Sequence, residues 1–118
     1  LYAGDNDIAN GETSEQVVAD FRTFAAKVRS RLPDTDLAFL PIKPSLARLG
    51  LWEEMKKANA AILQLTTKEP HLHYLDIATP MLETGQPRSE YFLADGLHLN
   101  EKGYRVWNAV VGPWLDAR

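Results

Sequence analysis

Cysteine is absent from this sequence of 118 residues. The absence excludes disulfides, thiolate metal sites and a cysteine nucleophile. Basic residues are not in excess either, since 13 Lys and Arg against 16 Asp and Glu give a net charge of −3. This balance argues against a nucleic-acid-binding protein, whose phosphate contacts need clustered cations. Long apolar runs are also missing, and none approaches the roughly 18 residues that indicate a membrane span.

The chain begins without a methionine and without a signal peptide, so its first residues give no indication of cellular compartment. It opens on the apolar stub Leu1-Tyr2-Ala3, followed by Gly4. Such a stub is typical of the end of a strand. We therefore expect that the strand begins upstream and that residues 1–118 are the C-terminal part of a single domain.

Two helices and two strands are predicted over the first two thirds of the chain. Thr13 and Gln16 have the spacing of a capping box, and Pro33 ends the helix that follows. A second helix is predicted over residues 51–65. Apolar runs predict strands at residues 36–42 and 73–77. The residues expected to face inward on the two helices are Val17, Phe21, Phe24, Ala25, Val28 and Leu32, then Leu51, Met55, Ala58, Ile62 and Leu65.

The last helix is predicted to start at the cap Asn100 and to end near Leu115, after a loop over residues 91–99. Its expected buried stripe comprises Tyr104, Trp107, Val110, Val111 and Trp114. Strands that alternate with helices indicate right-handed crossovers and a parallel, three-layer α/β sheet. Functional sites in such sheets lie beyond the carboxyl ends of the strands.

Two polar segments fall at those ends. In Asp95-Gly96-Leu97-His98, a carboxylate three residues before an imidazole can fix the ring tautomer and leave the second nitrogen free to take a proton from a serine hydroxyl. In Gly4-Asp5-Asn6-Asp7, Gly4 permits a tight turn and the Asn6 amide can donate to a developing oxyanion. Taken singly, each segment is more often an ordinary solvated turn.

Together the segments resemble the conserved blocks of SGNH (GDSL) hydrolases. Gly4-Asp5-Asn6-Asp7 is similar to their Gly-x-Asn-Asp block, and Asp95-Gly96-Leu97-His98 to their Asp-x-x-His block. Between them, residues 39–45 look like the fourth strand and its Pro-Ser turn, with Arg48 where an arginine is common. The motifs, including the region of Trp52 and Asn59, look most similar to bacterial esterases akin to platelet-activating-factor acetylhydrolase subunits.

The resemblance implies a flavodoxin-like three-layer α/β fold with strand order 2-1-3-4-5, of which this chain would supply the tip of strand 3 and strands 4 and 5. It implies that His98 is the general base, Asp95 its orienting carboxylate and Asn6 an oxyanion-hole donor, with Gly4 and Asp7 supporting the Asn6 loop. The implied reaction is hydrolysis of a small carboxylic ester through an acyl-serine, without metal or cofactor. The nucleophilic serine and a second oxyanion donor would lie upstream.

Other interpretations remain open at this point. The chain could be a non-catalytic binding or assembly module that retains the fold. Among its own serines, Ser45 lies at a strand end, a plausible place for a nucleophile, but not on a nucleophile elbow. His71-x-His73 could hold zinc, although no third ligand is evident, and residues 5–12 fail the calcium-loop template. Arg48 could bind a substrate carboxylate, Asp5 or Asp7, and a structural ion pair is favoured.

Association is a further expectation. Without the first strands and their helices, apolar surface of the sheet and helices would be uncovered. We expect that surface to bind the N-terminal half or a second copy of the chain.

Overall fold

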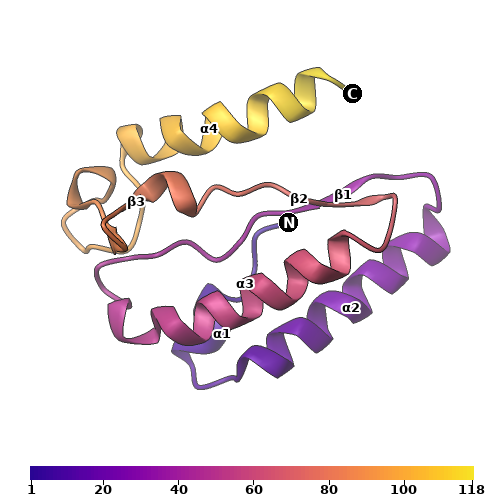
Figure 1. Cartoon of the computed structure of the whole chain (residues 1–118), viewed down its shortest axis with the longest axis horizontal. Coiled ribbons are helices and arrows are strands. Elements are labelled where there is room, and N and C mark those ends of the chain that lie inside the picture. Colours follow the sequence, from indigo (N-terminus) through magenta and orange to yellow (C-terminus); the bar gives the residue numbers. More distant parts are fainter.

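A computed structural model describes all residues, 1–118 (Figure 1). Four helices are present: α1 (Asp5–Ala9), α2 (Ser14–Arg31), α3 (Trp52–Thr66) and α4 (Glu101–Asp116). The strands are β1 (Leu37–Phe39), β2 (Leu72–Tyr74), β3 (Leu82–Glu83) and β4 (Gln86–Pro87). Short 3₁₀ turns cover Leu49–Leu51, Thr79–Met81 and Ser89–Tyr91. None of the helices combines the length and the apolar character that a membrane crossing requires.

A small parallel sheet forms the centre of the structure. β1 pairs in parallel with β2, with Leu37 opposite Leu72 and Phe39 opposite Tyr74. The start of the chain extends this sheet, because Tyr2 forms a parallel bridge with Leu40. The three parallel segments therefore lie in the order Tyr2, β1, β2, as alternation of helices and strands predicted.

Both strands are shorter than predicted. β1 stops at Phe39 because Pro41 and Pro44 follow it and have no N–H to donate to a ladder. β2 stops at Tyr74 because the chain then turns at Asp76, whose carboxylate accepts the backbone N–H groups of Ala78 and Thr79 at 3.0 and 2.9 Å. The antiparallel β3–β4 hairpin was not expected from the sequence.

Helices lie on both sides of the sheet. Figure 1 shows α2 and α3 side by side on one side of β1 and β2, and α4 on the other. The main core lies under α2 and α3 and includes Phe39, Ile42, Met55, Ala58 and Ile62. A smaller cluster of Met81, Phe92 and Leu99 lies beneath α4. The arrangement is that of an α/β protein.

The first long helix begins as predicted and buries a narrower face than predicted. The Thr13 side chain accepts the N–H of Gln16, and the Gln16 side chain accepts the N–H of Thr13, which completes the capping box. Val17 and Phe21 are buried. Phe24 and Leu32, which were expected inside, are 42% and 56% exposed, because the sheet that this helix covers is only three short segments wide.

The buried stripe predicted for the last helix is found only in part. In α4 only Gly103 is buried; Tyr104 is 52% exposed, and Trp107, Val110, Val111 and Trp114 are half-buried. The reason is that α4 packs chiefly on the 3₁₀ turns Ser89–Tyr91 and Thr79–Met81. Beyond these turns, Trp107 packs on Tyr2 and Trp114 on His73 of β2, with ring centroids 5.1 and 5.3 Å apart.

Candidate active site

The loop before α4 holds an imidazole against a carboxylate. Asp95 Oδ2 lies 2.5 Å from His98 Nδ1, while Asp95 Oδ1 accepts the backbone N–H groups of Leu97 and His98 at 2.9 and 3.0 Å. The hydrogen bond with His98, followed by those two N–H groups, lowers the pKa of Asp95 to about 2. The carboxylate therefore stays ionised in neutral solution, and its bond to Nδ1 leaves Nε2 of His98 free for proton transfer.

This loop is fixed at both ends. Asn100 caps α4 by accepting the Gly103 N–H at 3.0 Å, and its own amide donates to the carbonyls of Glu90 and Phe92 at 2.7 and 3.2 Å. The turn itself contacts the segment after β1, because the N–H of Ala47 donates to the Gly96 carbonyl at 3.0 Å. The position of His98 is thus set by secondary structure on both sides.

The second predicted segment forms the start of α1 rather than a simple turn. Gly4 has φ +109°, and a Cβ added there would lie 2.9 Å from Ile42 Cδ1 and 3.1 Å from Val17 Cγ1. Glycine is therefore required at this position both by backbone conformation and by packing. Asn6 follows in the first turn of α1, where its side chain is solvent-exposed and its Nδ2 donates to no protein atom.

A charge network lies beneath Asn6. The Arg48–Asp5 ion pair in it is the structural pair favoured from the sequence, whereas Lys43 and Tyr2 were not predicted. Asp5 is only 6% exposed and is contacted by Lys43 Nζ at 2.8 Å, Arg48 Nη1 at 2.7 Å and the Tyr2 hydroxyl at 2.8 Å. Burial by itself raises the pKa of Asp5, but the hydrogen bonds and charge of Lys43, with the bonds from Tyr2 and Arg48, outweigh it and lower the pKa. Asp5 is therefore a carboxylate paired with two cations.

Tyr2 and Lys43 were missed in the sequence for different reasons. Burial, followed by the neighbouring Asp5 charge, raises the pKa of Tyr2, so this phenol stays protonated and donates. Nothing in its apolar stub indicates that role. Lys43 gave a usable signal, because a single cation between Pro41 and Pro44 at the end of a buried strand requires an acidic partner.

The two predicted segments line one cavity of about 230 Å³. Asn6 and His98 both face it, together with Arg48 and the aromatic side chains Tyr104 and Trp107. Asp7 does not line this cavity. Its backbone carbonyl accepts the N–H groups of Asn10 and Glu12, at 3.2 and 3.0 Å, which closes the turn after α1.

No serine lines this cavity. Ser45, the one serine at a strand end, is 1% exposed, and its Oγ has no hydrogen-bond partner. Its burial prevents direct attack on a substrate in this structure. Ser14 is also buried, at the start of α2 beside Glu54.

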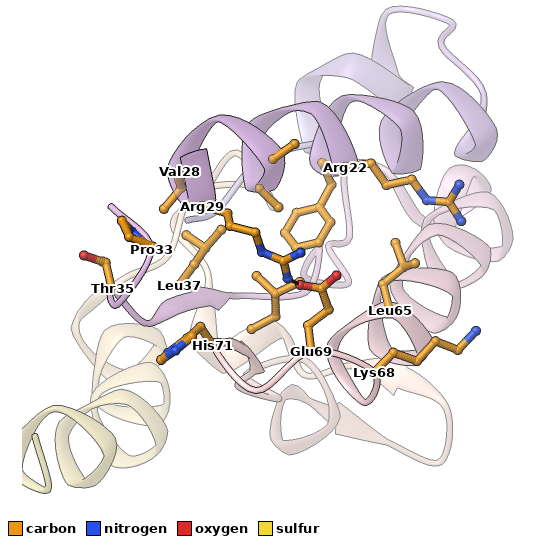
Figure 2. A pocket seen from close by; sticks show the side chains of 14 residues that line it. Arg22, Val28, Arg29, Pro33, Thr35, Leu37, Leu65, Lys68, Glu69 and His71 are labelled. Carbon is orange, nitrogen blue, oxygen red and sulfur yellow. Dashed lines mark ion pairs between the residues drawn. The ribbon is translucent and has the colours of Figure 1, made fainter. Parts of the chain in front are cut away.

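The two other histidines share a different carboxylate. His73 Nε2 and His71 Nδ1 lie 2.9 and 3.3 Å from Asp36 Oδ1, and the structure contains no cluster of three or more metal-ligating side chains. Near them, a hollow of about 290 Å³ opens between α2 and α3 (Figure 2). Figure 2 shows the ion pair of Arg29 with Glu69 across it. Neither member of the Asp95–His98 pair lines it.

The family of the chain follows from comparison with known proteins. The GDSL-like lipase/acylhydrolase family model matches residues 1–106. The chain therefore belongs to this family, as the motifs at both of its ends predicted. No curated protein gives a match.

Solved structures share the fold at low sequence identity. A candidate platelet activating factor from Streptococcus pneumonia superposes with TM-score 0.86 at 22% identity, over 98% of this chain and 57% of its own. A carbohydrate esterase family 3 protein from Talaromyces cellulolyticus has TM-score 0.81 and 17% identity, over 98% and 55%. The esterase domain of the zebrafish ZfL2-1 ORF1 protein superposes with TM-score 0.77 at 21% identity, over 98% of this chain and 66% of its own. The chain thus spans little more than half the length of the first two.

Proposed function

We propose that the protein to which this chain belongs hydrolyses carboxylic esters by acyl transfer to a serine and then to water. The single observation that carries the proposal is that Asn6 and the Asp95-oriented His98 line the same cavity. Membership of the GDSL-like lipase/acylhydrolase family supports the same reaction class. The serine nucleophile is assigned to an upstream segment, since no serine of these 118 residues lines the cavity.

Each side chain has a definite role in this proposal. His98 removes the proton from the serine hydroxyl and later returns it to the leaving alcohol. Asp95, ionised at neutral pH, holds the ring in one tautomer and stabilises the imidazolium. The Asn6 amide donates to the oxyanion of the tetrahedral intermediate. Gly4 supports Asn6 by admitting the turn into α1, and Asp7 by closing the turn after it.

The proposed substrate is a small ester. The cavity measures about 230 Å³ within this chain, and it has aromatic walls beside polar groups. This composition suits a short acyl group such as acetyl. The proposed chemistry is carried by side chains alone, with no step assigned to a metal or cofactor.

The proposal includes an assembly. We assign residues 1–118 to the C-terminal part of one flavodoxin-like three-layer domain, which the N-terminal half completes. Two features support this: Tyr2 forms the outer edge of the parallel sheet, and an apolar hollow of about 200 Å³ beside it is lined by Leu1, Ala3, Phe21 and Phe24 among others. An open edge with apolar surroundings is suited to pairing with a further strand. A second copy of the chain is the alternative occupant.

The test is hydrolysis of p-nitrophenyl acetate by the full-length protein and by residues 1–118 alone. We expect turnover only with the full-length protein, and loss of kcat by roughly 10²-fold or more in Asn6→Ala and His98→Ala. A phosphonate ester should label a serine upstream of residue 1, located by mass spectrometry. Turnover by the 118-residue chain that survives both substitutions would contradict the proposal.

A further inference from the structure

We infer that Arg48 is a positioning residue: its guanidinium fixes the Asn6 amide so that the NH₂ group, and not the oxygen, faces the active-site cavity. The inference rests on the proposed function, in which Asn6 donates to the oxyanion. It concerns the orientation of the donor, which family membership does not specify. A freely rotating amide would present its oxygen to the oxyanion part of the time, and that oxygen would repel it.

The chemistry of the contact determines the orientation. Arg48 Nη1 lies 2.9 Å from Asn6 Oδ1. A guanidinium has only donors, so the amide atom that faces it must be the carbonyl oxygen. The planar amide then directs Nδ2 away from Arg48, and Nδ2 has no protein acceptor that would hold it elsewhere. Asn6 is therefore left with a donor available in the cavity that it shares with His98.

Arg48 itself is held from below. The same Nη1 donates to Asp5 Oδ1 at 2.7 Å, so its two hydrogens are used by two neighbouring residues of the chain. Asp5 is in turn fixed by Lys43 Nζ and the Tyr2 hydroxyl, both at 2.8 Å. The guanidinium is thus anchored on a buried carboxylate, and the Arg48 side chain is 20% exposed. A long flexible side chain becomes a fixed donor by this means.

The backbone next to Arg48 connects the two halves of the site. Ala47 N–H donates to the Gly96 carbonyl in the turn that carries Asp95 and His98. Arg48 therefore reaches Asn6 from a segment that is bonded directly to the His98 turn. The orientation of Asn6, the proposed oxyanion donor, therefore depends on the same loop that positions His98, the proposed general base.

A competing role is direct binding of substrate, because Arg48 also lines the cavity and its Nε and Nη2 donate to no protein atom. Positioning of Asn6 and direct binding of substrate can be distinguished by their effects on kcat and KM. A residue that acts through Asn6 changes kcat and loses its effect once the amide is removed. A residue that binds substrate changes KM whether or not the amide is present.

The experiment is a double-mutant cycle in the full-length protein, with Arg48→Met, Asn6→Ala and both together. The substrate is p-nitrophenyl acetate, and kcat, KM and the melting temperature are measured for each. We expect Arg48→Met to lower kcat by roughly 10-fold to 100-fold with KM changed by less than about threefold. In the Asn6→Ala background, Arg48→Met should lower kcat by no more than about twofold. Arg48→Lys should recover only part of kcat, because an ammonium lacks the fixed planar fork.

Lys43→Met is the stability-matched comparison. It removes a cation from the same buried carboxylate, at 2.8 Å, and Lys43 forms no hydrogen bond with Asn6. We expect it to lower the melting temperature at least as much as Arg48→Met does while lowering kcat less.

The outcomes distinguish this inference from the proposed function. If Asn6→Ala and His98→Ala leave kcat unchanged, the proposed function is wrong and the inference is lost with it. If Asn6→Ala lowers kcat strongly but Arg48→Met lowers it by the same factor in both backgrounds, the proposed function stands and the positioning role is refuted. An effect of Arg48→Met on KM alone assigns Arg48 to substrate binding and likewise refutes it.

Discussion

Gly103→Ala is a substitution for which helix propensity predicts higher stability and the structure predicts lower stability. In the interior of a helix, Gly→Ala normally stabilises by about 1 kcal/mol, because alanine restricts the unfolded chain and favours helix. At Gly103 a Cβ would lie 2.4 Å from the Tyr91 carbonyl oxygen and 3.0 Å from Leu99 Cβ and Cδ2. The first contact is with backbone, which cannot rotate away as a side chain can. Residue 103 is therefore where α4 touches the loop that leads to His98.

We expect Gly103→Ala to destabilise the chain by about 2 kcal/mol. Overpacking costs roughly 1–3 kcal/mol, and we use the upper part of this range because backbone must move. The higher helix propensity of alanine offsets about 1 kcal/mol of that cost. The matched control is Gly50→Ala, in the 3₁₀ turn before α3, where an added Cβ meets no atom within 4 Å. That substitution should stabilise by about 0.5 kcal/mol.

Urea unfolding followed by tryptophan fluorescence measures both variants. With a urea m-value of about 2 kcal/mol/M, the Gly103→Ala midpoint should fall by about 1 M, while the Gly50→Ala midpoint should rise slightly. A Gly103→Ala midpoint equal to or above that of the parent chain would refute the packing described between α4 and the Tyr91 segment. That result would also contradict a role for α4 in fixing the loop that carries His98.

Three further substitutions test other parts of the structure. Asn59→Ala should lower the free energy of unfolding by about 2–4 kcal/mol, because Asn59 bonds the Ile42 N–H and carbonyl at 2.8 and 3.0 Å in the core; urea midpoints check this, and a change below 1 kcal/mol contradicts it. Gly4→Ala should lower the melting temperature and, in the full-length protein, kcat as well, since its φ of +109° and its contact with Ile42 oppose any side chain; unchanged values refute the account of the turn. Asp95 has a folded pKa of about 2 against an ordinary 3.8, so the stability it contributes is present above pH 4 and is lost as the pH falls towards 2. Urea midpoints of the parent chain and Asp95→Asn should therefore differ at pH 6 and converge only as the pH falls to about 2, and a difference independent of pH contradicts the pairing.

Local patterns predicted the three long helices α2, α3 and α4 well, but not the short α1, because the signals of the long helices lie within a few residues. The capping box at Thr13 and Gln16 and the Asn100 cap are found as predicted, since each depends on backbone geometry over three residues. The motif residues Asn6 and His98 were also identified from short blocks, and they line one cavity. Their catalytic roles remain a prediction until the activity assays are done.

Burial was predicted less well because it depends on what covers a helix, and periodicity does not reveal this. The same apolar spacing buries Met55 in α3, which packs on α2 and the sheet, and leaves Tyr104 exposed in α4. In the charge network the Arg48 ion pair was favoured from the sequence, but the contact of Lys43 with Asp5 was missed for a related reason. Asp5 and Lys43 are 38 residues apart, and only the folded sheet brings the loop after β1 under the first turn of α1.

That network explains why an acidic residue directly precedes the proposed oxyanion donor. Near a developing negative charge, an isolated buried carboxylate would be unfavourable, since like charges oppose each other in a site with little water. Asp5 is not isolated, because Lys43 and Arg48 both pair with it and the three charges sum to +1. Asp5 thus anchors a cation directly against the Asn6 carbonyl, and the net field at the cavity favours an anion. Substituting Asp5 would therefore remove both the anchor of Arg48 and the balance of the network, which is why the orientation of Asn6 is better tested at Arg48 than at the more buried Asp5.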